Sequence, residues 1–505
     1  MKTIKNIIIT CCVFMAITGC DKGFEELNIN PYAINDLDPE IIFANTQVTL
    51  SFGSWEGEAT IVQYFQNAYD LGATSGFQFN ENNNNFNQIR WGNYGDPIKN
   101  LVQGLENIGD NPSKTNLKSM MRIWKALIFM NMVDTHADVP YSEAGRAYLD
   151  SNYTPKYDDD AVIYEDLYKE IKEASAALNP TADIVTADLI YNGDVTKWQR
   201  MANSLLLRLG MRYSKVNPTK AASIALEAFN AGVMQTNADD CVLFYNDLYT
   251  NEMNEISGNN PRFYYLEEPL INRFQLTDDP RSTYISGKYP DPNDVLNTPP
   301  DVTLAEQQGF PVGYSDFTAA DLPDFPGTKG TGLDYSQPNY FALFSTLAPR
   351  FFITNSQTKL LLAEAAFRGW IPGNAQALYV EGIKASMDQY DLYPGGYGAI
   401  SVTDQDAYIA DAEVAYNATD ALELINTEYW VSNVNNPLEG WSNFRRSGFP
   451  ALSPNPYNGG LTGDGFVHRA PYPTQESGSN PDSYTAAGIA IGGDNLTTRV
   501  FWDIP

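Results

Sequence analysis

The feature that most constrains the fold is a series of apolar residues that recur at helical spacing in closely spaced pairs of segments. One pair covers about 196–213 and 219–231, and another covers about 356–369 and 374–390. Short turn-forming stretches, Asn217-Pro218 and Pro372-Gly373-Asn374, separate the members of each pair. A helix–turn–helix unit of about 35 residues is the size of a tetratricopeptide repeat. Because the consensus of that repeat is not legible, the periodicity predicts helical hairpins, in either a repeat array or an irregular bundle.

Two segments of different composition interrupt the helical pattern. Residues 72–95 are rich in glycine, asparagine and aromatic residues, and residues 246–340 are rich in proline, glycine and aspartate. A loop of the second length inside a compact chain is usually functional or disordered. Because disordered segments seldom contain many aromatic rings, we interpret both segments as ordered insertions. The sequence therefore predicts a mainly α fold, a single domain over 41–505 with loop insertions near 72–95 and 246–340.

The first twenty residues have the layout of a secretory signal. Lys2 and Lys5 form a basic head, and residues 7–17 form an apolar run that is too short to span a bilayer. The run ends in Ile17-Thr18-Gly19-Cys20, which resembles a bacterial lipobox. We expect residues 1–19 to be a signal peptide, Cys20 to be the lipidation site and residues 20–40 to form a lipidated tether. A plain cleaved signal with an incidental cysteine is the alternative.

Charge excludes one class of partner. The chain has 32 basic and 62 acidic side chains, and removal of the predicted signal changes the net charge from −30 to −32. Nucleic-acid binding requires clusters of Lys and Arg that displace counterions, and the sequence has none. Hydrophobic residues make up 43% of the chain, enough to bury a sizeable core. Cys241 would be the single unlipidated cysteine of the mature chain, and its apolar neighbours predict a buried, inert thiol.

Short motifs along the whole chain resemble one family. They are FEELNINP at 24–31, ADVPYSEA at 137–144, LLLAEAAFRG at 360–369, GWSNFRRSGFP at 440–450 and VFWD at 500–503. Together with the lipobox they are similar to the SusD/RagB-like outer-membrane lipoproteins of Bacteroidetes. The second motif departs from the GDVPYSEA pattern of that family at Ala137. Each motif is weak alone, but their number and order make the resemblance specific.

The resemblance implies a fold, a location and a partner. The fold would be four tetratricopeptide-like hairpins that support an irregular, loop-rich ligand-binding half. The protein would be lipid-anchored in the cell outer membrane, facing the exterior. It would bind oligosaccharides or polysaccharide, without catalysis, and deliver them to a SusC-like TonB-dependent transporter. A branch of the family that binds peptides is the main alternative.

Rings and amides in the loops are the predicted ligand contacts. Sugar rings stack their C–H faces on aromatic side chains, and polar side chains satisfy the hydroxyl groups. In this family the loop before the helix expected near Trp91 commonly contributes to the ligand site. The predicted ligand-binding residues are Trp55, Phe77, Phe79, Asn82, Asn84, Arg90, Arg262, Tyr264 and Tyr265. For any one of these rings, packing and ligand contact are equal alternatives, and Trp91 is assigned to packing.

The charged residues of the motifs are interpreted as scaffold. Glu364 and Arg368 lie four residues apart and predict a helical ion pair. Arg445 and Arg446 are expected to hold loop carbonyls or carboxylates, and His136 is expected to be a helix cap or a surface group.

No residue is predicted to be catalytic, and no metal or cofactor is predicted. The two histidines lie in unrelated contexts, and no metalloprotease, P-loop or nucleophile-elbow motif is present. A glycoside hydrolase needs only two carboxylates about 5–10 Å apart, so counting 62 acids does not exclude one. Structural calcium bound by loop carboxylates is a further alternative, although no EF-hand spacing occurs. A surface-layer or adhesin protein is the third functional class.

Overall fold

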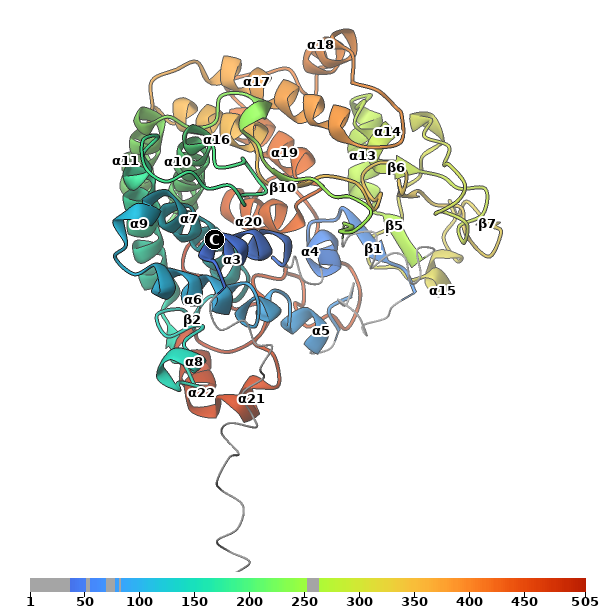
Figure 1. Cartoon of the computed structure of the whole chain (residues 1–505). Helices are drawn as coiled ribbons and strands as arrows, with labels where there is room; N and C mark the ends of the chain where they lie inside the picture. The colour runs from blue at the N-terminus through green and yellow to red at the C-terminus, as the bar shows by residue number, and fades with distance from the viewer. Residues whose placement is uncertain (1–36, 51–54, 70–77, 81–82, 252–262) are drawn as a thin grey trace, which may run out of the picture.

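Four pairs of long helices form the scaffold of the described chain (Figure 1). The computed structural model describes residues 37–50, 55–69, 78–80, 83–251 and 263–505, apart from the side chains of residues 55 and 56. The pairs are α7 (Thr115–His136) with α9 (Asp160–Ala177), α10 (Val195–Arg212) with α11 (Pro218–Ala231), α16 (Asn355–Phe367) with α17 (Ala375–Asp388), and α19 (Ala421–Ser432) with α20 (Pro437–Ser447). Neighbouring pairs touch through α9 and α10, α10 and α16, and α16 and α19. The predicted helical hairpins are therefore confirmed.

Local sequence explains where these helices begin. Asp194 caps α10 by accepting hydrogen bonds from the backbone N–H groups of Thr196 and Lys197, at 2.9 and 3.1 Å. Asn217 caps α11, and Pro218 occupies its first turn, where no N–H donor is needed. The Asn-Pro pair that ends one helical pattern in the sequence thus starts the next helix.

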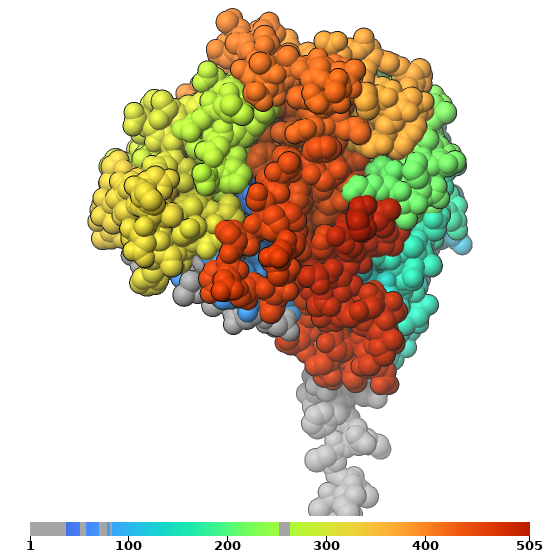
Figure 2. Space-filling view, turned by 180° about the vertical axis from the view of Figure 1, so that it is seen from behind, coloured from blue at the N-terminus to red at the C-terminus, as the bar shows by residue number. Residues whose placement is uncertain are grey.

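Shorter elements surround the scaffold. The remaining α-helices are α3 (Pro39–Val48), α4 (Trp55–Ile61), α5 (Asn84–Asn87), α6 (Ile98–Ile108), α8 (Ala147–Asp150), α13 (Glu268–Leu276), α14 (Ser282–Ile285), α15 (Asp316–Ala319), α18 (Val402–Ala410), α21 (Glu476–Ser479) and α22 (Pro481–Ala490). Strands of two to four residues form antiparallel pairs: β1 (Phe65–Asn67) with β5 (Tyr264–Leu266), β2 (Val139–Pro140) with β3 (Tyr157–Asp158), β4 (Cys241–Leu243) with β10 (Arg350–Ile353), β6 (Ser286–Gly287) with β9 (Gln337–Pro338), and β7 (Thr328–Lys329) with β8 (Gly332–Leu333). Seen from behind, the segment from residue 263 to about 340 forms a yellow-green lobe beside the red-orange C-terminal part (Figure 2).

Buried ion pairs connect the helices of the scaffold. Arg446 on α20 makes a bidentate pair with Glu364 on α16, with Nη1–Oε1 and Nη2–Oε2 distances of 2.9 and 2.7 Å. Arg368 adds a third contact to Glu364, at 2.8 Å, as the four-residue spacing predicted. Arg445 donates to the carbonyl oxygens of His468 and Asp134. Arg446 therefore holds a carboxylate and Arg445 holds two carbonyl groups, which confirms the interpretation of these two residues as scaffold.

Two local predictions are wrong. The helix expected near Trp91 begins only at Ile98, because residues 91–94 form a separate 3₁₀ turn, η1 (Trp91–Tyr94). His136 is neither a cap nor a surface group: its ring is fully buried, with Nδ1 and Nε2 at 3.1 and 2.8 Å from the carbonyl oxygens of Ala470 and Ile89. Burial lowers its pKa to about 3, so the ring is neutral at physiological pH.

The environment of Cys241 agrees with its prediction. The thiol is buried in β4, and burial raises its pKa well above the usual value. Within the part of the chain that the structure describes, no helix is long and apolar enough to cross a bilayer.

Candidate functional site

The β1–β5 pair joins the segment just before the first predicted insertion to the second predicted insertion, on one side of the molecule (Figure 1). Asn67 lies opposite Tyr264, and the backbone N–H of Asp316 donates to the carbonyl oxygen of Ala68 at 3.1 Å. A second contact joins the loop 78–80 to the C-terminal loop, where Leu461 N–H donates to Phe79 O at 2.7 Å. We call the described residues 67–69, 78–80, 263–264, 311–317 and 455–461 the loop face.

Aromatic side chains are accessible on this loop face. The rings of Tyr69 and Phe263 are half-buried and lie tilted against each other, with centroids 4.3 Å apart and an interplanar angle of 34°. Phe317, on α15, is 75% exposed. Tyr314 is half-buried, and its carbonyl oxygen accepts a hydrogen bond from Gln66 Nε2. Exposed rings beside backbone and amide polar groups are what a sugar-binding surface requires.

Three of the predicted ligand rings belong to the core instead. Tyr265 is fully buried, stacks on Phe310 at 5.3 Å, and its hydroxyl accepts the Leu333 N–H at 3.1 Å. Tyr264 is buried in the β1–β5 pair. Phe79 is buried edge-on against Phe86, with centroids 5.4 Å apart. These contacts favour packing, the alternative that loop context left open.

The two polar predictions within the described residues have protein partners. Arg90 is buried beside Glu58, with a 2.7 Å contact from Nη2 to Oε2, and is not accessible to a ligand in this structure. Asn84 joins the loop to the C-terminal segment: its Oδ1 accepts from Thr474 N–H at 2.8 Å, and its Nδ2 donates to Gln475 at 3.2 Å. The predictions for Cys20, Phe77, Asn82, Arg262 and the side chain of Trp55 fall outside the described residues.

Sequence reasoning missed Tyr69, Phe263 and Phe317 as candidate contacts. Phe317 had a usable signal, because it is the one apolar residue in the polar stretch Ser315-Asp316-Phe317-Thr318. Ser315 and Thr318 there form a capping box that starts a short helix and turns Phe317 outwards. The Tyr69–Phe263 ring contact joins residues nearly 200 positions apart and has no local signal.

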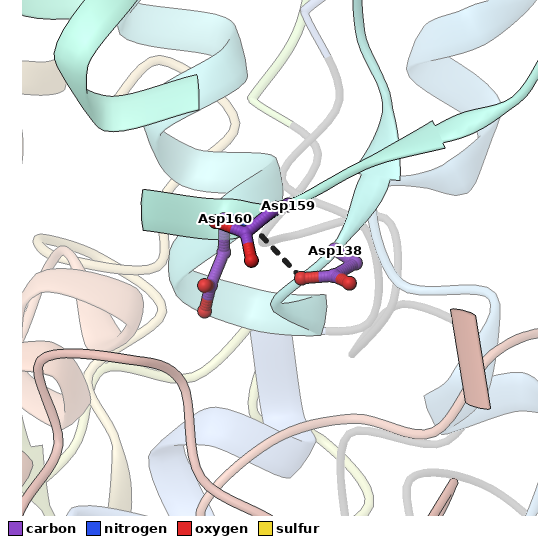
Figure 3. Close-up of side chains that lie close together, drawn as sticks. All are labelled: Asp138, Asp159 and Asp160. Carbon is purple, nitrogen blue, oxygen red and sulfur yellow. Dashed lines mark hydrogen bonds between the residues drawn. The ribbon is translucent and has the colours of Figure 1, made fainter. Parts of the chain in front are cut away.

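The described residues contain one group of carboxylates close enough to hold a metal ion. The groups of Asp138, Asp159 and Asp160 each offer an oxygen within 4.8 Å of the others (Figure 3). Each also accepts a backbone N–H: Asp138 from Asp160, Asp159 from Val162 and Asp160 from Phe501, at 2.9, 3.0 and 2.8 Å. These bonds tie the start of α9 to β2 and to the C-terminal segment. An all-oxygen donor set suits hard divalent cations, but the bonds themselves already give the cluster a structural role.

Burial sets the ionisation of this cluster. It raises the pKa of Asp138 to about 6, and it raises the pKa of Asp160 to about 7 with help from the neighbouring negative charges. The two groups therefore exchange protons with solvent near neutral pH.

Comparison with known proteins identifies the family. A profile of SusD-like proteins, described as starch-binding and associating with the outer membrane, matches residues 31–473. The chain belongs to the SusD-like family. No curated protein matches this SusD-like chain.

Solved structures agree with the assignment. A chitin-binding protein is 28% identical to this SusD-like chain, with a TM-score of 0.80 over 92% of this chain and 100% of the other. A SusD-like protein named Bacteroidetes AC2a has 24% identity and a TM-score of 0.80, over 93% of this chain and 100% of the other. A chitin-binding SusD homologue from Flavobacterium johnsoniae has 22% identity and a TM-score of 0.73, over 92% of this chain and 98% of the other. The SusD-like all-α fold predicted from the motifs is therefore confirmed.

Proposed function

We propose that this SusD-like protein is a non-catalytic, lipid-anchored glycan-binding protein on the outer surface of the outer membrane. Its glycan would lie on the loop face, against Tyr69, Phe263 and Phe317. The observation that carries this proposal is that one exposed ring, Phe317, and two half-buried rings, Tyr69 and Phe263, lie beside polar backbone groups on one surface. The starch-binding description of the family and the chitin-binding relative give the ligand class further support.

Affinity electrophoresis in gels that contain soluble starch or glycol chitin tests this function. We expect retardation by at least one polysaccharide, with no release of reducing ends. Release of reducing sugar that a single carboxylate substitution abolishes would instead establish a glycoside hydrolase. Retention of peptides and of no polysaccharide would establish the peptide-binding alternative.

We further propose that bound glycan passes to a SusC-like TonB-dependent transporter, which contacts an apolar groove on the scaffold. The groove has a volume of about 450 Å³ and lies between α3 and the end of β4. Ile41, Phe244 and Tyr249 line it, and each of these apolar side chains is more than half exposed. Contiguous exposed apolar side chains are typical of protein interfaces, particularly on a strongly acidic chain.

The position of the groove supports the transporter as its occupant. Ile41 lies on α3, directly after the predicted tether of residues 20–40, the last two of which the structure places in α3. The seventeen residues 20–36 that precede the described chain span at most about 60 Å when extended, so the groove would lie within about that distance of the membrane that would hold both proteins.

Co-purification of the full-length, membrane-extracted protein with its barrel tests this contact. Phe244→Asp should reduce recovery of the barrel at least about tenfold, because it places a charge in an apolar interface. Phe317→Asp, the same substitution at a more exposed position on the loop face, is the control and should leave recovery unchanged. Equal recovery with Phe244→Asp and wild type would contradict docking through this groove.

A further inference from the structure

A pocket of about 240 Å³ lies between η1, the β2–α8 loop, residues 152–155 and α21, at the end of the molecule away from β5 and α15 (Figure 1). We propose that it is a second sugar site, separate from the loop face, which binds a sugar residue that carries an ammonium group. The proposal rests on the proposed glycan-binding function and adds a ligand class to it. We call this cavity the Trp91 pocket; its lining includes Trp91, Tyr94, Lys99, Glu143, Tyr153 and Glu476.

Aromatic rings form part of the wall of the Trp91 pocket. Trp91 is half-buried, and edge-on contacts with Tyr94 and His136 hold its ring, at centroid distances of 5.2 and 5.1 Å. Tyr153 lines the same cavity and is 73% exposed. Aromatic rings stack on the C–H faces of sugars, and the negative faces of their π-systems attract cations. Such a wall suits a sugar ring and also a positively charged group.

Two carboxylates of the wall have only uncharged hydrogen-bond donors among the described residues. Glu143 accepts from Asn152 Nδ2 at 2.9 Å and from the backbone N–H of Lys156 at 3.0 Å. Glu476 accepts from the Tyr157 hydroxyl at 2.7 Å and from the hydroxyl of the last residue of α21 at 3.2 Å. Uncharged donors orient a carboxylate without neutralising it, so both groups attract a positively charged ligand.

The same hydrogen bonds place the two carboxylates at the cavity. Asn152, which donates to Glu143, itself lines the pocket. Tyr157, which donates to Glu476, has its ring centroid 6.0 Å from that of Trp91. Both glutamates are half-buried, so their side chains are accessible from the pocket. Glu476 therefore lies beside the aromatic wall, where an ammonium group can contact a ring and a carboxylate together.

The basic residues near the pocket do not neutralise these carboxylates. Arg146 makes ion pairs with Glu106 and Asp150, neither of which lines the pocket. The ammonium group of Lys156 pairs with an aspartate two residues along the chain, at 3.0 Å. Lys99 forms no ion pair with a carboxylate of the described residues. Its charge opposes a cationic ligand, so its removal should strengthen the binding of one or leave it unchanged.

The rigidity of the pocket favours an amino sugar over a lysine side chain. The Tyr94 hydroxyl donates to Pro140 O at 2.7 Å, and Asn480 Nδ2 donates to Pro155 O at 2.7 Å, so the wall is held together before a ligand binds. A sugar ring enters such a preformed site with little loss of conformational entropy, whereas a lysine side chain loses its rotamer freedom. A cavity of about 240 Å³ also suits one sugar ring better than an extended chain.

Isothermal titration calorimetry at pH 6 with the trisaccharide of glucosamine tests the proposal, and the N-acetylated trisaccharide is its uncharged match. We expect the wild-type protein to bind the amino trisaccharide at least about tenfold more tightly, with the difference falling as salt is raised. Glu476→Gln should weaken binding of the amino trisaccharide about tenfold and leave that of its match unchanged. Tyr153→Ala should weaken it about fivefold, and Tyr153→Phe, which keeps the ring, should match wild type.

Asp482→Asn is the matched control. Asp482 is exposed on α22, next to α21, and does not line the pocket. Its substitution removes the same charge as Glu476→Gln, so it measures the contribution of net charge alone. We expect it to change affinity for the amino trisaccharide by less than about twofold. Lys99→Gln should not weaken binding.

Four results would overturn the second site. Equal affinity of the wild-type protein for the two trisaccharides is the first, and weaker binding of the amino trisaccharide by Lys99→Gln is the second. Equal losses with Asp482→Asn and Glu476→Gln are the third, since net charge alone would then explain the preference. The fourth is binding of trilysine as tightly as the amino trisaccharide, which would assign the pocket to basic peptides.

The proposed function is tested separately. A preference that is lost in Phe317→Ala and kept in Glu476→Gln would place the amino sugar on the loop face, which would overturn the second site and leave the proposed function intact. Failure of the proposed function would appear as absence of polysaccharide retention in the electrophoresis experiment.

Discussion

Glu364 in the helical scaffold and Glu267 in the loop-rich half are both fully buried, but their surroundings are opposite. Burial alone would raise the pKa of Glu364, yet the charges and hydrogen bonds of Arg446 and Arg368 lower it to about 2. Glu267 has no hydrogen-bond partner for either carboxylate oxygen among the described residues, and burial raises its pKa well above the usual value. Glu364 is a fixed anion that joins α16 to α20, whereas Glu267 is a neutral acid.

The difference extends beyond these two residues. Arg212 on α10 contacts Glu439 and Asp134 at 2.7 and 3.2 Å, so the buried charges that join α7, α10 and α20 are compensated. On the loop face, Gln78 is buried while neither end of its amide has a partner among the described residues. The buried charges of the scaffold are thus paired with opposite charges, although single nitrogen atoms such as Arg212 Nη1 have no partner among the described residues. The loop half carries uncompensated polar groups, as ligand-binding regions often do.

Glu364→Gln should have the largest effect on stability. It leaves two arginines without their anion, one of them fully buried, and should lower the free energy of unfolding by about 3–5 kcal/mol in urea titrations at pH 7. The stabilisation from a carboxylate with a lowered pKa is present above the unfolded pKa and is lost as pH falls towards 2, so the effect should shrink in acid. Glu381→Gln, which breaks the exposed pair with Lys359, is the matched control and should cost under about 1 kcal/mol. Equal costs would contradict the central role of the buried pair.

Glu267→Gln should act in the opposite direction. The unfolded carboxyl ionises freely above its ordinary pKa whereas the folded one does not, so native Glu267 destabilises the fold increasingly as pH rises. The amide removes this cost and should stabilise the protein by about 1–3 kcal/mol at pH 8, and by much less at pH 5. Urea titrations at the two pH values measure the difference. A pH-independent effect, or destabilisation at pH 8, would show that the carboxylate has a partner.

Asp160→Asn should give a smaller effect of the same sign. The raised pKa of Asp160 means that the fold loses stability as pH rises from about 4 to 7. Asparagine keeps an oxygen for Phe501 N–H and removes the repulsion with Asp138, so we expect a gain of about 1 kcal/mol at pH 8 and none at pH 4. Asp159→Asn preserves the helix cap at an exposed position and removes one of the charges that raise the pKa of Asp160, so it should weaken the pH dependence without abolishing it. Identical pH profiles for the two variants would refute this assignment.

Sequence reasoning succeeded where the determinants are local. Helical spacing and caps such as Asp194 lie within one or two turns, so the hairpins could be predicted without tertiary information. The fate of Arg90 depends on Glu58, 32 positions away on another helix, and that of Tyr265 depends on Phe310. Loop composition alone could not show that Arg90 and Tyr265 are buried, because the partners that bury them lie elsewhere in the chain. Recognition of the family motifs supplied the ligand class, not the contacts.

The central claim is that the loop face binds glycan while the scaffold supports it. Affinity electrophoresis of Tyr69→Ala and Phe317→Ala beside Phe367→Ala, an exposed ring on α16, tests the claim most directly. We expect the two loop-face variants to lose at least about tenfold in affinity for the retained polysaccharide, and Phe367→Ala to match wild type. Circular dichroism should be unchanged in all three. The account would be contradicted if both loop-face variants were retarded by the polysaccharide as strongly as the wild-type protein. It would also be contradicted if Phe367→Ala alone lost this retardation.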